Sequence, residues 1–448
     1  MSRISPPALI DNRAIWAIAL PAMVTNVATA LIGIGDMWIV GRLEDAATQG
    51  AVDIGARLFA VLFTVMNFLK TGTTGLVAQE GTRAGEEAQV AMLVRGLFVG
   101  LVIAGLLLLF KPVILPALLS ALGARADVLE AARIYADIRY WTAPAVMANL
   151  ALIGFLVGRR QMTAVLLFEV AYNVLNIALG LLFVLRLDMG IEGIGWSSFV
   201  AEYVKLAAVT AFVFRGPVLA NFRTIATTGA SMSWRTLAPF LSTNRDLFLR
   251  TVILMIALAA LTRLSAERGP AMLAANGILY QLFVFTALLL DGFENAAQVL
   301  NGERMGARDR KGFKRYIKAI LLRGFAAAAV VSLGFLLLAD PILASFAATD
   351  RVRDIAQKSG WWLTIIPFAG VAGFVFDGVY VGASWTRALL VTMVGAALVF
   401  AVSLWVTWGW GNAGLWFSFT LFLGVRAALQ VVLMPGQMAA SFGELAKT

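Results

Sequence analysis

Residues 21–26 read PAMVTN and residues 239–244 read PFLSTN, so proline, threonine and asparagine recur with the same spacing. GTRAG at 81–85 has a counterpart in GERMG at 302–306, and the pattern Trp-x-Ser-Phe at 196–199 has one at 416–419. The three offsets are 218, 221 and 220 residues. A nearly constant period over half the chain predicts an internal repeat, and therefore two related halves.

The chain around these repeats is strongly apolar. It has 448 residues, of which 60% are hydrophobic and 14% charged, whereas a soluble protein carries about 25% charged residues. About 20 apolar residues cross the hydrocarbon core of a bilayer as a helix. We therefore predict an all-α polytopic membrane protein with twelve transmembrane helices, at 14–38, 51–78, 88–110, 133–157, 163–186, 191–214, 236–260, 272–300, 317–339, 354–381, 388–408 and 412–434.

Six helices per half predict a parallel repeat. Because six is even, both halves enter the membrane with the same orientation and are related by an axis along its normal. We expect an N-lobe at 1–214, a cytoplasmic linker at 215–234 and a C-lobe at 235–448. Two lobes that rock around a central site are typical of transporters that work by alternating access.

Charge and composition limit which side chains could carry a proton and indicate where the protein is located. The chain has no histidine and no cysteine, so any proton-coupled step would depend on a carboxylate whose pKa is raised by desolvation. With the N-terminus in the cytoplasm, the inside loops have a modest excess of basic residues, as the positive-inside rule expects, and the net charge of +10 does not indicate nucleic acid. The N-terminal residues do not resemble a cleavable signal peptide. We expect a multi-pass protein of a bacterial inner membrane with both termini in the cytoplasm.

Prolines repeat with the two halves. Pro21, Pro144, Pro239 and Pro367 fall in the first and fourth predicted helices of each half. Proline removes a backbone hydrogen bond and kinks a helix. In lipid this is tolerated where neighbours or water satisfy the freed carbonyl. The prolines thus indicate either kinks beside a cavity or kinks that only shape packing.

Asp36 is the exceptional acidic residue. It lies in LIGIGDMWIVG at 31–41, with no basic residue within a helical turn inside the span. An ionised aspartate at the centre of a membrane helix costs roughly 2.5–3.5 kcal/mol. We expect Asp36 to take up a proton near neutral pH. The alternative is that it lies at the outer membrane surface and is simply hydrated.

Polar residues follow one face of two helices. Thr25, Thr29 and Asp36 share a face of the first predicted helix, and the fifth carries a stripe with helical spacing. Two such stripes predict a hydrated N-lobe cavity, although polar residues also bond between membrane helices. The residues expected to line it, besides Asp36, are Thr25, Thr29, Asn149, Glu169, Asn173 and Asn176.

Other intramembrane charges have possible counterions. Opposite charges three or four residues apart meet on one face of a helix, which predicts ion pairs of Asp53 with Arg57, Asp246 with Arg250 and Glu202 with Lys205. Asp291, Glu294 and Asp377 have Arg245, Arg250, Arg323 and Arg426 available as counterions in the same half. A charge-balanced C-lobe polar network is expected to include Arg245, Asp246, Arg250, Asp291, Glu294 and Asp377.

Several segments in this order resemble the multidrug and toxic compound extrusion (MATE) family, and its DinF branch most closely. They are IALPAMVTNVATALIGIGDMWIVGRL at 18–43, GTTGLVAQEGTRAG at 72–85, NVLNIAL at 173–179, NRDLFLR at 244–250, LLLDGFENAAQ at 288–298 and FDGVYVGASWTR at 376–387. The resemblance implies a two-lobed, twelve-helix exporter of bulky, often cationic and hydrophobic compounds, driven by protons or Na⁺. It implies that Asp36 is the coupling carboxylate, Pro21 the helix-1 hinge and Asn176 a polar partner on the fifth helix.

One departure from the family pattern bears on the coupling ion. Many relatives have a second acid on the fifth helix, where this chain has Gly180. The C-lobe acids of the Na⁺-linked NorM branch do not match cleanly either, because Asp246 follows Arg245. This favours protons over Na⁺, with one principal carboxylate.

The sequence therefore predicts a secondary active multidrug antiporter that exports hydrophobic or cationic organic compounds in exchange for protons. Na⁺-coupled export and flipping of lipid-linked saccharides are the alternatives. We expect no enzymatic activity, metal site or cofactor, and a monomer whose partners are small molecules, protons and lipid. Gly33–Asp36 spells the GxGD of intramembrane aspartyl proteases, but no helix precedes it to supply their second aspartate. No phosphate-binding loop for ATP is present.

Overall fold

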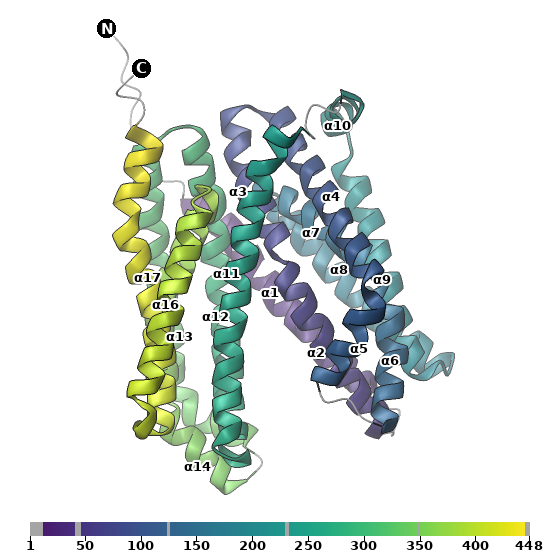
Figure 1. The fold of residues 1–448 in the computed structure, drawn as a ribbon, viewed down its shortest axis with the longest axis vertical. Helices are drawn as coiled ribbons and strands as arrows, with labels where there is room; N and C mark the ends of the chain where they lie inside the picture. The colour runs from purple at the N-terminus through teal and green to yellow at the C-terminus, as the bar shows by residue number, and fades with distance from the viewer. Residues whose placement is uncertain (1–11, 41–45, 123–125, 229–232, 348, 444–448) are drawn as a thin grey trace. The chain divides into compact units, whose positions relative to one another are not determined.

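The computed structural model describes residues 12–40, 46–122, 126–228, 233–347 and 349–443, with side chains for all of these except 30–40, 46–49, 126–127, 226 and 228. Every regular element in these ranges is helical (Figure 1). The helices are α1 (Asn12–Val40), α2 (Ala46–Met66), α3 (Phe68–Arg83), α4 (Glu86–Leu109), α5 (Lys111–Ala121), α6 (Ala126–Tyr140), α7 (Ala143–Gly158), α8 (Met162–Leu181), α9 (Gly190–Val213), α10 (Pro217–Thr228), α11 (Trp234–Glu267), α12 (Pro270–Gly306), α13 (Arg310–Phe346), α14 (Asp350–Ser359), α15 (Trp362–Gly382), α16 (Thr386–Val406) and α17 (Asn412–Gly443). A π-helical turn, Leu182–Arg186, follows α8, and a 3₁₀ turn, Trp408–Trp410, precedes α17.

All twelve predicted spans fall on these helices. Within the described residues, nine helices are long and apolar enough to cross a membrane, and the number rises to eleven if two bent helix pairs are each one span. The 29-residue helix α1, which is described only in part, covers the remaining predicted span. The fold is thus all-α and polytopic, and is consistent with twelve transmembrane helices.

The chain forms two compact units. Unit 1 consists of Met1–Met23 and Arg245–Thr448, and unit 2 of Val24–Asn244. α1 and α11, the first helices of the two sequence repeats, are each shared between the units. The first part of α1 belongs with the second half of the chain, and the first part of α11 with the first half. The predicted lobe boundaries at 214 and 235 remain a prediction.

The four repeated prolines have different effects on their helices. Pro144 lies in the first turn of α7, where a 50° bend separates α6 from α7. Proline is well suited to a first turn because its missing N–H would have no helical partner there. Pro21, Pro239 and Pro367 lie inside α1, α11 and α15, which continue through them.

A helix occupies the predicted linker. α10 follows α9 after a 99° bend, with Gly216 at a φ of +53°, a conformation that favours glycine. Val218 and Ile225 form the buried side of α10, which packs against α4 within unit 2.

Paired glycines bring helices into close contact in unit 2. α7 packs against α3, and a Cβ placed on Gly154 would lie 2.6 Å from the carbonyl oxygen of Lys70. A Cβ on Gly158 would lie 2.8 Å from the carbonyl oxygen of Thr74. Small residues four apart allow membrane helices to approach at the backbone, where dispersion replaces the hydrophobic drive.

Paired glycines approach backbone carbonyls in the same way in unit 1. α15 packs against α12, and Cβ atoms on Gly378 and Gly382 would lie 2.1 Å and 2.2 Å from the carbonyl oxygens of Glu294 and Gln298. In both units, glycines four residues apart thus meet carbonyls four residues apart. The internal repeat is therefore visible in helix packing as well as in sequence.

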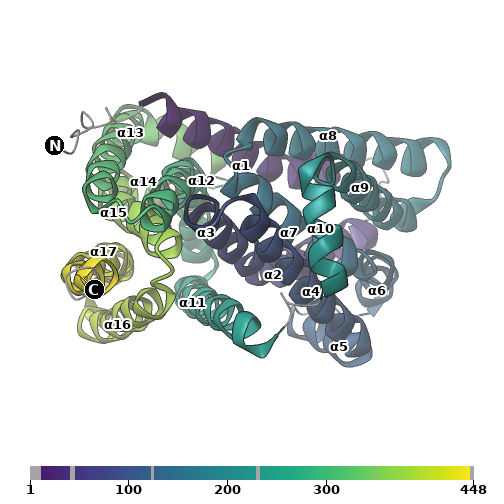
Figure 2. The same ribbon diagram turned by 90° about the horizontal axis from the view of Figure 1, so that it is seen from above.

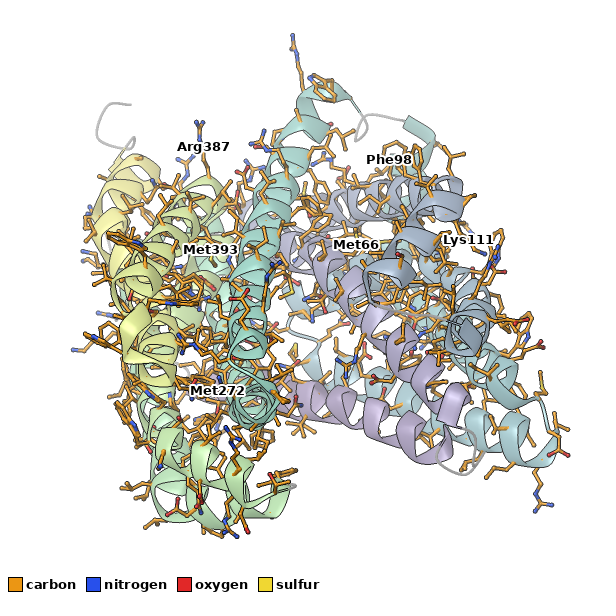
Figure 3. The ribbon with its side chains drawn as sticks, turned by 60° about the horizontal axis from the view of Figure 1, so that its bottom comes forward. Met66, Phe98, Lys111, Met272, Arg387 and Met393 are labelled. Atoms are coloured by element: carbon orange, nitrogen blue, oxygen red, sulfur yellow. The ribbon has the colours of Figure 1, made fainter. Side chains whose placement is uncertain are left out.

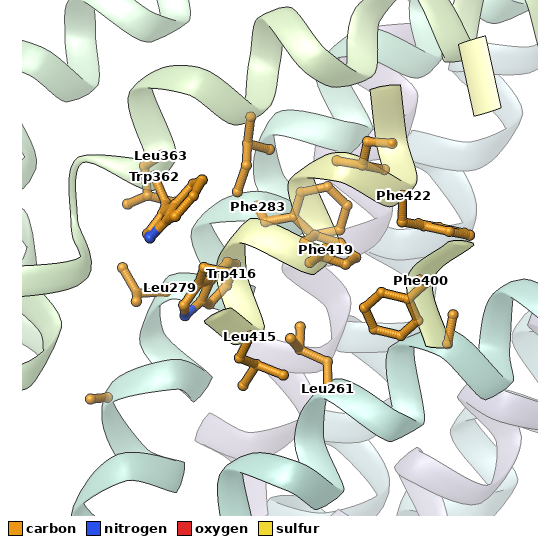
Figure 4. Packing of buried hydrophobic residues seen from close by; sticks show 14 of the residues in the cluster. Leu261, Leu279, Phe283, Trp362, Leu363, Phe400, Leu415, Trp416, Phe419 and Phe422 are labelled. Atoms are coloured by element: carbon orange, nitrogen blue, oxygen red, sulfur yellow. The ribbon is translucent and has the colours of Figure 1, made fainter. Parts of the chain in front are cut away.

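Unit 1 contains an aromatic core. Phe283 of α12 meets Phe419 of α17 edge to face with ring centroids 4.9 Å apart, and Trp416 packs beside Phe419 (Figure 4). Helices α16 and α17 run side by side (Figures 1 and 2). Along α16, Met393 is buried, whereas Arg387 is exposed near the first turn (Figure 3).

A cluster of buried polar side chains is bonded to Trp416 of this core. Asn276 of α12 donates to Ser265 and Asn412, both at 2.8 Å, and accepts from Trp416 Nε1 at 2.9 Å. Asn412 also donates to Ser359 at 2.9 Å. The cluster therefore ties together α11, α12, α14 and α17, with each amide satisfied as a buried polar group requires.

Candidate functional site

The predicted polar stripe of the fifth span lies on the buried face of α8. Asn173 and Asn176 are 7% and 2% exposed, and Gly180 is buried beside them. Glu169, one turn earlier, is half-buried. Asn149 of α7, the other residue predicted for this cavity, is 3% exposed. The structure thus brings the predicted N-lobe residues of α7 and α8 into the interior of unit 2.

Charged and polar groups join α8 to α9. Lys205 Nζ lies 2.8 Å from Glu169 Oε1 and 4.7 Å from the ring centroid of Tyr172. Glu202 Oε1 accepts from Asn149 Nδ2 at 2.7 Å, and Tyr172 hydrogen-bonds to the same carboxylate. The predicted ion pair of Glu202 with Lys205 is therefore wrong, because the long lysine side chain reaches across to α8.

Several buried polar atoms near these groups have no partner. Within the described structure, neither amide atom of Asn173, nor Oδ1 of Asn176 or Asn149, nor Oγ of Ser198 makes a hydrogen bond. Leaving a buried polar group unsatisfied costs about 1–3 kcal/mol. Such atoms usually bind ordered water or a ligand. The interior of unit 2 therefore presents polar atoms with unused capacity for hydrogen bonds.

The first helix is described only in part. α1 continues to Val40, so the backbone of Asp36 is helical, but its side chain lies outside the described residues. Thr29 is exposed, and its hydroxyl donates at 2.9 Å to the carbonyl of Thr25 on the same helix. Pro21 and Thr25 are half-buried. The roles assigned to these residues remain predictions.

In unit 1, Asp377 of α15 is the centre of the charged cluster. It is fully buried, forms an ion pair with Arg250, and lies 3.6 Å from Arg426 Nη2. Gln430 Nε2 donates to its second oxygen at 2.6 Å. Asp291 and Glu294 of α12 interact electrostatically with both arginines.

The predicted C-lobe network forms two separate groups, one around Asp377 and one around Asp246. Asp246 bonds to Arg245 at 2.7 Å and accepts from Thr386 at 3.5 Å, so the predicted pair of Asp246 with Arg250 is wrong. Arg250 instead neutralises the more deeply buried Asp377, where a counterion is needed most. By contrast, Asp53 and Arg57 form the predicted pair at 3.0 Å.

Sequence reasoning missed Gln430, although it named Arg250 and Arg426 among the arginines available to Asp377, and both lie beside it. Arg426 and Gln430 are four apart on α17 and both are fully buried, a spacing that places them on one helix face. Arg323, another cation considered for this network, bonds to Asn12 and to the carbonyl of Ala319 instead.

A cavity of about 340 Å³ lies elsewhere in unit 2, between α3, α4 and the first part of α11. Arg83 and Arg95 line it, together with Glu80, which bonds to Arg83 at 2.7 Å. The remaining lining is mainly apolar and includes Pro239 and Phe240. The sequence did not indicate this cavity.

Comparisons with known proteins agree on one family. The MatE family model matches residues 21–182 and 247–406. The chain is 32% identical over 418 residues to DNA damage-inducible protein F of Escherichia coli, covering 93% of this chain and 90% of that protein. It is 26% identical over 442 residues to a probable multidrug resistance protein NorM of Rhizobium meliloti, covering 93% and 91%.

A solved structure gives the same fold. A crystal structure of MATE in the bent conformation superposes with a TM-score of 0.86 at 17% identity, covering 97% of each chain. The same family is indicated by the repeated halves and helical fold, by the family model and by the relatives. The chain therefore belongs to the MatE family of multidrug transporters and is a homologue of DinF.

Proposed function

We propose that this protein exports hydrophobic or cationic organic compounds in exchange for protons, by alternating access. Asp36 is the group that binds proton and substrate in turn. A neutral carboxyl group does not attract a cation and an ionised one does, so the two ligands exclude each other at this residue. The relative named as a probable multidrug resistance protein supports the substrate class.

The observation that carries the proposal is the unsatisfied polar interior of unit 2. Asn173 and Asn176 present unpartnered amide atoms in the unit that also contains the second part of α1. The acid at the centre of unit 1, Asp377, is already held by two arginines and Gln430. Asp377 is therefore already paired with cations, and the proposal assigns proton exchange to Asp36 instead.

The charge balance of the exchange determines whether the membrane potential or the pH difference drives export. Moving one charge across 100 mV is worth about 2.3 kcal/mol, so exchange of one proton for one monovalent cation is electrically silent. Export is then driven only by the pH difference, at about 1.4 kcal/mol per unit. This corresponds to about one decade of accumulation per pH unit.

The setting of the proposal is a bacterial inner membrane. The protein acts there as a monomer with both termini in the cytoplasm, and its partners are lipid, protons and small organic molecules. No cofactor or metal takes part. Bacterial relatives of the family and the positive charge of the predicted cytoplasmic loops support this setting.

The coupling ion is tested with purified protein in proteoliposomes. Ethidium transport is measured under an imposed pH gradient without Na⁺, and under an imposed Na⁺ gradient at equal pH. The proposal expects transport with the pH gradient alone, at a rate that an added membrane potential leaves unchanged. Transport that requires the Na⁺ gradient would overturn proton coupling in favour of Na⁺.

A further inference from the structure

α8 and α9 run antiparallel in unit 2, and their facing positions form a ladder of polar side chains. Glu169 pairs with Lys205, and Tyr172 pairs with Glu202. Continuing in this register, up α8 and down the numbering of α9, places Asn176 opposite Ser198. The two helices lie side by side (Figures 1 and 2). Polar side chains therefore follow this interface from Glu169 to Asn176, with contacts at the first two positions and the third placed by register.

Glu202 is the unusual member of this ladder. It is 7% exposed, and its direct hydrogen-bond partners are the neutral side chains of Asn149 and Tyr172. Lys205, three residues further along α9, bonds to Glu169 and interacts with Glu202 only electrostatically. Glu202 is therefore held by neutral hydrogen-bond donors, whereas Asp377 of unit 1 is held by guanidinium groups.

The other ionisable groups around Glu202 are few. α8 contributes Glu169 and Tyr172, α9 contributes Lys205, and α6 contributes Arg139, which bonds to the Tyr135 hydroxyl and interacts with Tyr172. α7 has no ionisable side chain. Protonation of Glu202 therefore leaves the ion pair of Glu169 with Lys205 intact, so a proton can be added without breaking the helix contact.

Beyond Glu202 the ladder has the properties of a water-filled path. Both amide atoms of Asn173, Oδ1 of Asn176 and Oγ of Ser198 are buried and lack partners in the described structure. Buried atoms of this kind typically bond to internal water. Water molecules linked by amide and hydroxyl groups can carry a proton between two carboxyl groups.

We propose that this α8–α9 ladder carries the coupling proton between the interior of the N-lobe and the cytoplasm, with Glu202 as the carrier. The proton passes from the interior of the N-lobe along the water chain to the Glu202 carboxylate, which becomes neutral. Glu202 then releases it to cytoplasmic water. The residue lies 11 positions before the end of α9 at Val213, about 16 Å along the helix. This inference rests on the proposed function.

The test separates proton movement from substrate movement. In proteoliposomes, pH-driven ethidium transport requires net proton transfer, whereas exchange of labelled for unlabelled ethidium at equal pH does not. Glu202→Gln is expected to slow the first by roughly tenfold or more and to leave the second within about twofold of wild type. Glu202→Asp is expected to recover part of the pH-driven rate. Glu192→Gln, at an exposed position of the same helix, is the matched control.

A second variant distinguishes a loss of proton transfer from a loss of folding. Asn173 has no hydrogen bond to lose among described residues, so Asn173→Leu is expected to keep the melting temperature while blocking the water path and slowing pH-driven transport. Normal pH-driven transport by Glu202→Gln and Asn173→Leu would overturn the inference. So would an equal loss of transport and exchange in both. If the wild-type protein itself does not respond to a pH gradient, it is the proposed function that has failed.

Discussion

Gln430 donates a hydrogen bond of 2.6 Å to Asp377 where Asp377 is completely buried. The second carboxylate oxygen faces Arg250 and Arg426, so one acid contacts guanidinium groups from two different helices. A charge cluster of this kind organises unit 1, because α11, α15 and α17 each contribute a member to it. Its consequences for stability can be measured.

Asp377→Asn is expected to destabilise the protein by about 3–5 kcal/mol, because it leaves two buried arginines without their shared counterion. The measurement is the melting temperature in detergent, followed by tryptophan fluorescence. Asp53→Asn is the matched control, because its partner Arg57 is 69% exposed and the pair contributes little. Equal melting temperatures for the two variants would contradict this account of unit 1.

Gly378→Ala is expected to destabilise unit 1 by about 1–3 kcal/mol, since its methyl group would lie 2.1 Å from the carbonyl oxygen of Glu294 and push α15 from α12. Gly334→Ala, on α13, is the control because a Cβ there meets nothing within 4 Å. That control should be neutral or stabilising by up to about 1 kcal/mol. If both alanine variants melt alike, the close helix contact does not contribute as described.

Asn276→Leu is expected to cost about 1–3 kcal/mol, because it leaves Trp416 Nε1, Asn412 and Ser265 without their shared partner. Thermal unfolding measures the loss, and the intrinsic fluorescence of Trp416 should change with it. Thr262→Val, at an exposed position bonded only to its own helix, is the control. A neutral Asn276→Leu would show that water replaces the cluster.

The positions of the membrane spans were predictable, whereas the partners of several charged side chains on different helices were not. Long apolar runs between polar loops defined all twelve spans, because the thickness of a bilayer sets the length of a helix. Partners predicted from spacing along one helix were wrong where the true partner lies on another: Arg250 binds Asp377 rather than Asp246, and Lys205 binds Glu169 rather than Glu202. Helical spacing identifies neighbours only along one helix, whereas these contacts depend on how two helices cross.

The burial of the N-lobe asparagines was foreseeable for the same reason. Asn173, Asn176 and Gly180 share a helix face, and that face is the buried one. The sequence did not indicate that Asn173 would lack any partner, since this depends on α7 and α9 together. It likewise gave no sign of the glycine contacts, because GxxxG spacing alone does not identify the opposing carbonyls.

The most direct test of proton coupling at Asp36 is pH-driven ethidium transport by Asp36→Asn in proteoliposomes. Asp53→Asn serves as the control for loss of one carboxylate in the same lobe. The account predicts that Asp36→Asn abolishes transport under the pH gradient, because its side chain can no longer exchange a proton, while Asp53→Asn transports as wild type. Transport by Asp36→Asn at the wild-type rate would contradict the account and direct the search to Asp291, Glu294 and Asp377.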